Sequence, residues 1–235
     1  MKTKIISLLL CMGIVVSCNN TGKGMGLGAG GGALLGGAIG ALAGKSVGGA
    51  LIGAAIGGAV GTGAGYIIGN KMDKAKKEAE QALQQSAQVE TVTDTNGLEA
   101  VKVTFDSGIL FATGKADLSA TAKTSLSKLS GVLKNNADCD VSIKGYTDNA
   151  GWRGATAEQS IEKNKALSVD RAASVSNYLL SLTVPASQIK SVEGLGQENP
   201  VADNSTAAGQ AQNRRVETYL YASEQMIKDA EAQAK

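Results

Sequence analysis

The sequence predicts a glycine-rich helical hairpin near the N-terminus. From Leu98 it predicts an α/β (α+β) sandwich, in which helices pack on a mixed sheet. The chain has 235 residues, enough for one or two domains. Glycines crowd into residues 22–69, whereas the composition from Leu98 onward is ordinary for a globular domain. In that second part, segments of alternating apolar residues alternate with segments of helical periodicity, which is typical of βαβ units.

The composition excludes several classes of function. The 23 Lys and Arg nearly balance the 21 Asp and Glu, so there is no basic excess of the kind that binds nucleic acid. The chain has no histidine, which removes the commonest general base and metal ligand. The cysteines Cys11, Cys18 and Cys139 show no metal-binding spacing, and we expect Cys139 to be a small buried apolar residue. We expect no cofactor, no metal and no nucleic-acid partner.

Residues 1–17 have the pattern of a signal peptide. Two lysines among the first four residues precede an apolar stretch, Ile5–Val16, that is too short to span a bilayer comfortably. The tetrapeptide Val15–Cys18 resembles a lipobox, in which the cysteine is acylated and becomes the first mature residue. We therefore expect lipidation of Cys18, with residues 18–23 as a tether. The alternative is a plain secretory signal that happens to contain a cysteine.

Residues 24–70 carry glycine at every fourth position. The two series are Gly24, Gly28, Gly32, Gly36, Gly40, Gly44 and Gly48, and then Gly49, Gly53, Gly57, Gly61, Gly65 and Gly69. On an α-helix this spacing makes a bare groove along one face, in which two backbones approach closely. The change of phase predicts a membrane-associated hairpin that turns near residues 44–49, and a homo-oligomer is a further possibility. The alternative is a flexible linker. The segment resembles the glycine zippers of some outer-membrane lipoproteins.

Residues 71–97 are expected to form a solvated helical spacer and a linker, because Lys71–Gln88 is charged, alanine-rich and helix-favouring and Asp94–Gly97 is typical of a turn. Residues 98–221 then predict a mixed four-stranded sheet with two long helices, followed by a helical tail over residues 222–235. The predicted strands are Val101–Phe105, Asp140–Tyr146, Ile189–Gly194 and Arg215–Tyr221, and the predicted helices are Leu118–Leu133 and Ala157–Leu182.

Four segments of residues 98–221 resemble, in order, the OmpA-like peptidoglycan-binding domain. They are Phe105–Phe111 with Gly114–Leu118, then Gly145–Gly151, then Asn164–Val175, and finally Gly194–Gly196 with Pro200 and Asn213–Glu217. Together with the lipobox and the glycine series, they match the lipoprotein branch of this family. The resemblance implies a βαβαβ-type domain that binds the diamino acid in the stem peptide of peptidoglycan.

That ligand has an ammonium and a carboxylate at its free end. By motif position, Asp148 is the acceptor for the ammonium, and Arg171 is the fork that holds the carboxylate. Asn164 precedes Arg171 by two helical turns and resembles a ligand contact of the family. The remaining residues that the resemblance implies are Thr147, Leu167, Arg214 and Arg215. One of these two arginines is expected to line the site, and the other to pack or to form an ion pair.

Simpler interpretations of these residues exist. Asp148 can cap a turn, Arg171 can be a solvated helix charge, and Asn213–Arg215 can begin an edge strand.

The sequence also departs from the family pattern at two places. Ala112 stands where many members have an acidic residue, and an insertion around Trp152–Glu162 predicts a longer loop or an earlier helix start. Trp152 itself either contacts a glycan or covers an edge of the core.

These observations predict a non-catalytic, lipid-anchored protein of the outer membrane, with its C-terminal domain in the periplasm, that ties the membrane to the cell wall. A cell-wall hydrolase would need a nucleophile with its base, or paired carboxylates, and no such motif is present. A second alternative is a glycine-zipper oligomer or pore that the C-terminal domain only localises.

Overall fold

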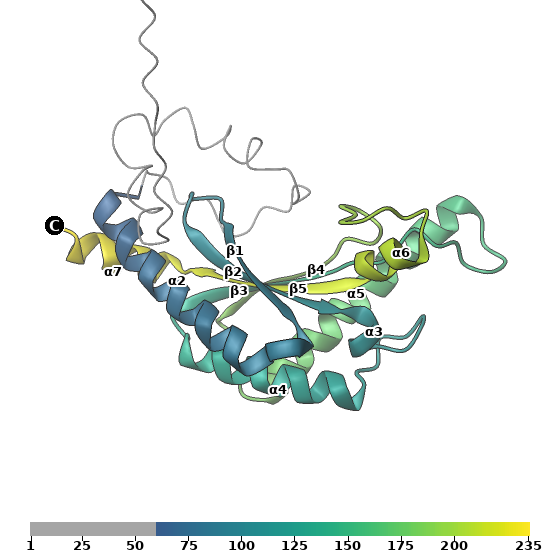
Figure 1. Cartoon of the computed structure of the whole chain (residues 1–235), viewed down its shortest axis with the longest axis horizontal. Coiled ribbons are helices and arrows are strands. Elements are labelled where there is room, and N and C mark those ends of the chain that lie inside the picture. The colour runs from purple at the N-terminus through teal and green to yellow at the C-terminus, as the bar shows by residue number, and fades with distance from the viewer. Residues whose placement is uncertain (1–59) are drawn as a thin grey trace, which may run out of the picture.

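The computed structural model describes residues 60–235, which form a mixed sheet with helices packed on it (Figure 1). The helices are α2 (Thr62–Leu83), α3 (Ser107–Leu110), α4 (Ala120–Asn135), α5 (Ala157–Ser181), α6 (Ala207–Asn213) and α7 (Glu224–Gln233), with a 3-10 turn at Gln84–Ser86. The strands are β1 (Gln88–Thr93), β2 (Glu99–Asp106), β3 (Cys139–Gly145), β4 (Ile189–Gly194) and β5 (Arg215–Ala222). The predicted α/β sandwich is confirmed.

The sheet has the strand order β1-β2-β5-β3-β4. β3 and β4 are parallel and are joined by the crossover helix α5, whereas the other neighbouring strands are antiparallel. The four predicted strands are present, but the sheet has five. The additional strand, β1, forms a hairpin with β2 through the predicted turn, where the Asp94 side chain accepts hydrogen bonds from the backbone N–H groups of Asn96 and Leu98, both at 2.8 Å.

Side-chain caps set the starts of the two long helices near the expected positions. The Ser119 hydroxyl accepts a hydrogen bond from the N–H of Ala122 and begins α4. At α5, Thr156 and Gln159 form a reciprocal capping box, which fixes the helix start inside the insertion.

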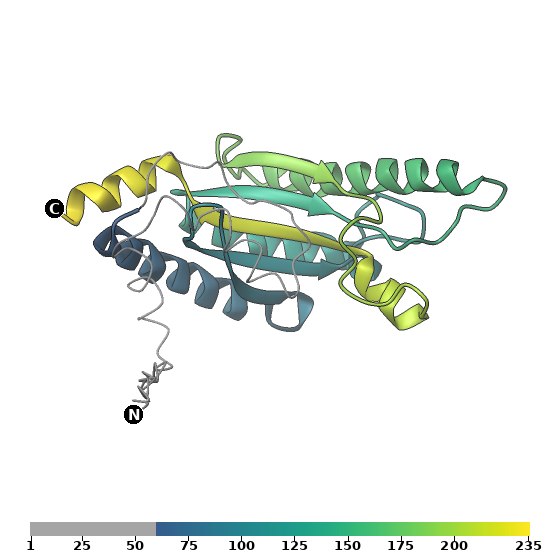
Figure 2. The same ribbon diagram turned by 90° about the horizontal axis from the view of Figure 1, so that it is seen from above.

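The helix predicted within residues 71–97 is present as the C-terminal part of α2, but the prediction that it is solvated is wrong. One face of α2 is buried in the core and packs beside α4 and α7, and β1 belongs to the sheet (Figure 2). The buried residues of α2 are Ala64, Gly65, Ile68, Met72, Ala75, Ala79 and Leu83. In the charged half of the helix, Ala75 and Ala79 are set among lysines and glutamates, so the apolar stripe is narrow and residues 71–83 look solvated in sequence.

The end of the predicted hairpin also belongs to this helix. Residues 62–70 of the expected membrane-associated segment 24–70 lie in α2, and their buried face packs on the domain. The remainder of that segment, the signal peptide and Cys18 lie outside the described residues. Within residues 60–235, no helix is both long enough and apolar enough to cross a membrane.

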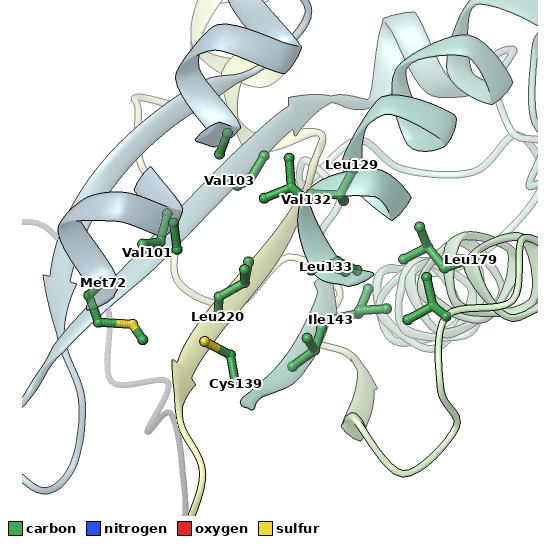
Figure 3. Packing of buried hydrophobic residues seen from close by; sticks show 14 of the residues in the cluster. Met72, Val101, Val103, Leu129, Val132, Leu133, Cys139, Ile143, Leu179 and Leu220 are labelled. Atoms are coloured by element: carbon green, nitrogen blue, oxygen red, sulfur yellow. The ribbon is translucent and has the colours of Figure 1, made fainter. Parts of the chain in front are cut away.

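The main core lies between the helices and the sheet. Figure 3 shows Met72 of α2 beside Val101 of β2, and Leu129 and Leu133 of α4 on the same side of the sheet. Cys139 is buried in this core, as expected, and burial raises the pKa of its thiol to about 12. This core packs α2 and α4 against strands β2, β3 and β5.

Candidate functional site

Asp148 lies just beyond the C-terminal end of β3, where the backbone is held on both sides. The N–H of Tyr146 donates to the carbonyl of Arg215 at 2.9 Å, and the N–H of Thr147 donates to the carbonyl of Gly196 at 2.7 Å. Three segments that are far apart in sequence therefore meet at this point, and Asp148 projects from a fixed backbone.

Two glycines bring α5 against the sheet at the same end. A Cβ on Gly145 would lie 2.3 Å from the carbonyl oxygen of Ser168, and one on Gly194 would lie 2.1 Å from the backbone nitrogen of Val169. Only glycine permits such an approach of strand and helix backbones. Both glycines are motif residues in the sequence, but their place in the motifs gives no sign of this packing role. The close contact fixes the height of α5, and thus of its side chains, above the sheet.

Asp148 is 7% exposed, and its carboxylate has two polar partners among residues 60–235. Its Oδ1 accepts a hydrogen bond from the N–H of Ala150 at 3.1 Å, so Asp148 does cap a turn. Its Oδ2 forms an ion pair with Nη1 of Arg214, whose side chain is 38% exposed. The carboxylate is therefore preorganised by the turn and neutralised from the solvent side by an arginine that remains partly accessible.

Arg171 is buried and is not the solvated helix charge of the simpler interpretation. Its Nε donates to the carbonyl of Lys115 at 3.0 Å, its Nη2 to the carbonyl of Ala112 at 3.5 Å, and its guanidinium lies 5.1 Å from the centre of the Phe111 ring. Burial lowers the pKa of Arg171, the positive charge of Arg214 lowers it further, and Asp148 opposes both effects. The two arginines and the aspartate are thus close enough to interact electrostatically.

The other expected residues of α5 lie on the same helix face as Arg171. Asn164 is buried, and its Nδ2 donates to the carbonyls of Ala150 at 3.1 Å and Asp148 at 3.4 Å, while Leu167 is half-buried between them in the helix. Thr147 is buried, and within residues 60–235 its hydroxyl has no hydrogen-bond partner. Asn164 therefore holds the loop that carries Asp148, which is a positioning role.

Arg215 does not share the surroundings of Arg214. It is buried, its Nε bonds to Oε1 of Glu217 at 2.8 Å, and its guanidinium stacks on Tyr146 at 3.6 Å from the ring centre. Tyr219 donates its hydroxyl to the other oxygen of Glu217 at 2.6 Å. Of the two arginines, Arg214 therefore lies beside Asp148 at the candidate site, and Arg215 is the one that packs and forms a buried ion pair.

A cavity of about 340 Å³ lies at the other end of the sheet, between α2, α7 and the segments that precede β3 and β4. Four of its five charged groups pair with one another, Lys71 with Asp138 at 2.6 Å and Lys190 with Asp140 at 3.6 Å, and Asp229 accepts a hydrogen bond from Gln225. None of its lining residues belongs to the cluster of Asp148, Arg171 and Arg214, and we place the candidate site at that cluster because its charges are unbalanced and converge. Over residues 60–235, no group of three potential metal ligands is present.

Comparison with known families identifies this part of the chain. A family model described as the OmpA family matches residues 110–214, the region that contains Asp148, Asn164, Arg171 and Arg214. Residues 110–214 form an OmpA-family domain. A second family model, described as a glycine zipper, matches residues 31–76 and so extends into α2 as far as residue 76.

Two bacterial proteins are similar to this chain over about half of its length. The chain is 37% identical over 129 residues to the probable lipoprotein YiaD of Escherichia coli, covering 55% of each chain. It is 39% identical over 109 residues to the peptidoglycan-binding protein ArfA of Mycobacterium tuberculosis, covering 46% of this chain and 31% of ArfA. The match thus spans about half of the first relative and about a third of the second.

A solved structure supports the same fold. The cell wall anchor of the T6SS from Pseudomonas aeruginosa superposes with a TM-score of 0.51 at 28% sequence identity, covering 65% of this chain and 97% of that chain.

Proposed function

We propose that the OmpA-family domain binds, without catalysis, the free end of the diamino acid in the stem peptide of peptidoglycan. The observation that carries the proposal is the convergence of Asp148, Arg171 and Arg214 from three separate segments at one end of the sheet. The names of the relatives support it, because ArfA is a peptidoglycan-binding protein and the superposed structure is a cell wall anchor.

The charges of this cluster suit a zwitterion. Two guanidinium groups and one carboxylate give a net positive site, which favours a ligand carboxylate, while Asp148 provides an acceptor for an ammonium. The two carbonyl contacts of Arg171 use two of its five N–H donors and fix the plane of the guanidinium. Arg214 is the mobile partner in this scheme, because it is partly exposed and can share Asp148 with the incoming ammonium.

The position at which α2 begins is consistent with a domain that is attached to a membrane through the residues before this helix. In Figure 1, α2 begins next to α7, at the end of the domain opposite to α6 and the start of α5. β5 runs between these ends, and its eight residues span about 26 Å. We propose that lipidated Cys18 and the glycine-zipper segment attach the chain to the outer membrane, and that the periplasmic domain presents its site away from that attachment.

The test is sedimentation of the purified protein with peptidoglycan sacculi. Losing a charged hydrogen-bond partner costs ~1.5–3 kcal/mol, so Asp148→Ala should weaken binding about 10–150-fold. Arg171→Lys should weaken it as well, because an ammonium cannot form the bidentate fork.

Two exposed neighbours provide matched controls. Arg153 is in the loop after Asp148, and Asp170 precedes Arg171 on α5. Arg153→Ala and Asp170→Ala change the same charges near the same place and should bind like the parent. If Asp148→Ala melts at the parental temperature and still binds sacculi with parental affinity, the proposed function is wrong.

A further inference from the structure

Trp152 lies in the inserted loop between β3 and α5, next to the candidate site. Its backbone N–H donates to the Ser160 hydroxyl at 3.0 Å, and its carbonyl accepts from the N–H of Ala155 at 3.0 Å. The Ser160 hydroxyl in turn donates to the carbonyl of Thr156 at 2.8 Å, in the capped start of α5. The loop is therefore folded onto the helix, and the indole, which is half-buried, has a defined position.

On one side, the indole is bonded to the segment that carries Asp148. Its Nε1 donates to Oδ1 of Asn164 at 2.7 Å, and the Nδ2 of the same amide donates to the carbonyls of Ala150 and Asp148. Asn164 is 4% exposed, so these bonds are shielded from water. The chain of bonds runs from the indole through one buried amide to the backbone of the acceptor residue.

On the other side, the indole reaches the segment that holds Arg171. The ring atom Cη2 lies 3.9 Å from the position that a Cβ on Gly114 would take. Gly114 has a φ of +67°, and it lies between Ala112 and Lys115, whose carbonyls bind the Arg171 guanidinium. The indole thus bridges the two loops that position the opposite charges of the site.

We propose that Trp152 is a wall of the ligand site and contacts the aliphatic chain of the bound diamino acid, an inference that rests on the proposed function. A diamino acid held by Asp148 at its ammonium and by Arg171 at its carboxylate has methylene groups next to its charged end. Those methylenes need an apolar surface, and the bridging indole supplies one beside both charges. Lys163 lies 5.8 Å from the ring centre and keeps a positive charge on this wall.

Because Trp152 is the only tryptophan in the sequence, the fluorescence of the full chain reports on this wall alone. The experiment titrates the full-length protein in detergent micelles with a soluble stem peptide that ends in a diamino acid with free ammonium and carboxylate groups. We expect a saturable change in tryptophan emission, and a much weaker response to the same peptide with that carboxylate amidated.

Calorimetric titration of variants separates the wall from the charges. Trp152→Ala should weaken binding of the peptide about tenfold through loss of apolar contact, and Trp152→Phe, which keeps a ring, should recover most of it. Ile161→Ala removes an exposed apolar residue of the same insertion, 49% exposed, and should bind like the parent.

The two proposals fail in different ways. If the parent binds the peptide and Asp148→Ala does not, yet emission stays constant and Trp152→Ala binds like the parent, the wall is refuted and the proposed function stands. If Trp152→Phe binds as weakly as Trp152→Ala while both melt at the parental temperature, an apolar contact is likewise refuted. If the parent does not bind the peptide at all, both proposals are overturned.

Discussion

Helix α2 is predicted to contribute to the stability of the folded domain, and Ile68 provides the sharpest test. Ile68 is 0% exposed and belongs to the main core cluster, so Ile68→Ala removes buried methyl and methylene groups without a path for water to replace them. Truncations of this kind cost ~2–5 kcal/mol, through lost transfer free energy and the cavity left behind. Alanine is a better helix former than isoleucine, so the loss cannot be attributed to helix propensity.

The assay is thermal unfolding of residues 60–235, followed by circular dichroism. For a domain of this size, each kcal/mol lowers the melting temperature by roughly 2–4 °C, so Ile68→Ala should melt about 4–20 °C below the parent. Tyr66→Ala is the matched control on the same helix, because Tyr66 is 43% exposed, and it should change the free energy of unfolding by less than about 0.5 kcal/mol. Equal melting temperatures for the two variants would refute the packing of α2 and restore the solvated spacer.

Three further predictions concern the site end of the sheet. Arg215→Ala should cost ~3–5 kcal/mol in urea unfolding, because it leaves the Glu217 charge buried without its arginine. Arg214→Ala should cost less, because the Arg214 side chain is 38% exposed and water can take its place beside Asp148; equal losses would contradict the separate roles. Burial alone would raise the pKa of Glu217, but Arg215 and hydrogen bonds outweigh burial and hold this pKa below its ordinary 4.5. The stability that the ionised Glu217 contributes is therefore complete above pH 4.5 and is lost as the pH falls through the lowered pKa. Glu217→Gln should remove that part of the acid dependence of urea unfolding. Gly145→Ala should destabilise the domain by at least ~1–3 kcal/mol in the same assay, because its Cβ would overlap the Ser168 carbonyl, and a parental urea midpoint would argue against the close packing of α5.

The sequence by itself determined four of the strands and two of the long helices of residues 98–222. The four predicted strands and two predicted long helices are present with bounds that differ by two residues or fewer, because apolar periodicity and capping residues act locally. The order of the motifs also gave Asp148 and Arg171 as candidate site residues, because each is identified from the motif in which it lies.

The tertiary structure alone decided which elements join the core and which polar groups pair. Four of the seven buried residues of α2 are alanine or glycine, so the stripe gives little hydropathy signal, and its burial depends on close packing against α4 and α7. β1 is an edge strand with mostly exposed side chains, and it therefore lacks the alternation that marks a strand in sequence.

The different partners of Arg214 and Arg215 also depend on the tertiary structure. Adjacent residues at the start of a strand point to opposite sides, so one side chain reaches Asp148 at the partly exposed site and the other reaches Glu217 in the buried interior. Their adjacency in the sequence indicates only that the two side chains point to opposite sides. Which role falls to which arginine depends on the partner that the fold brings to each side, and that partner lies 66 residues away for Arg214 and two residues away for Arg215.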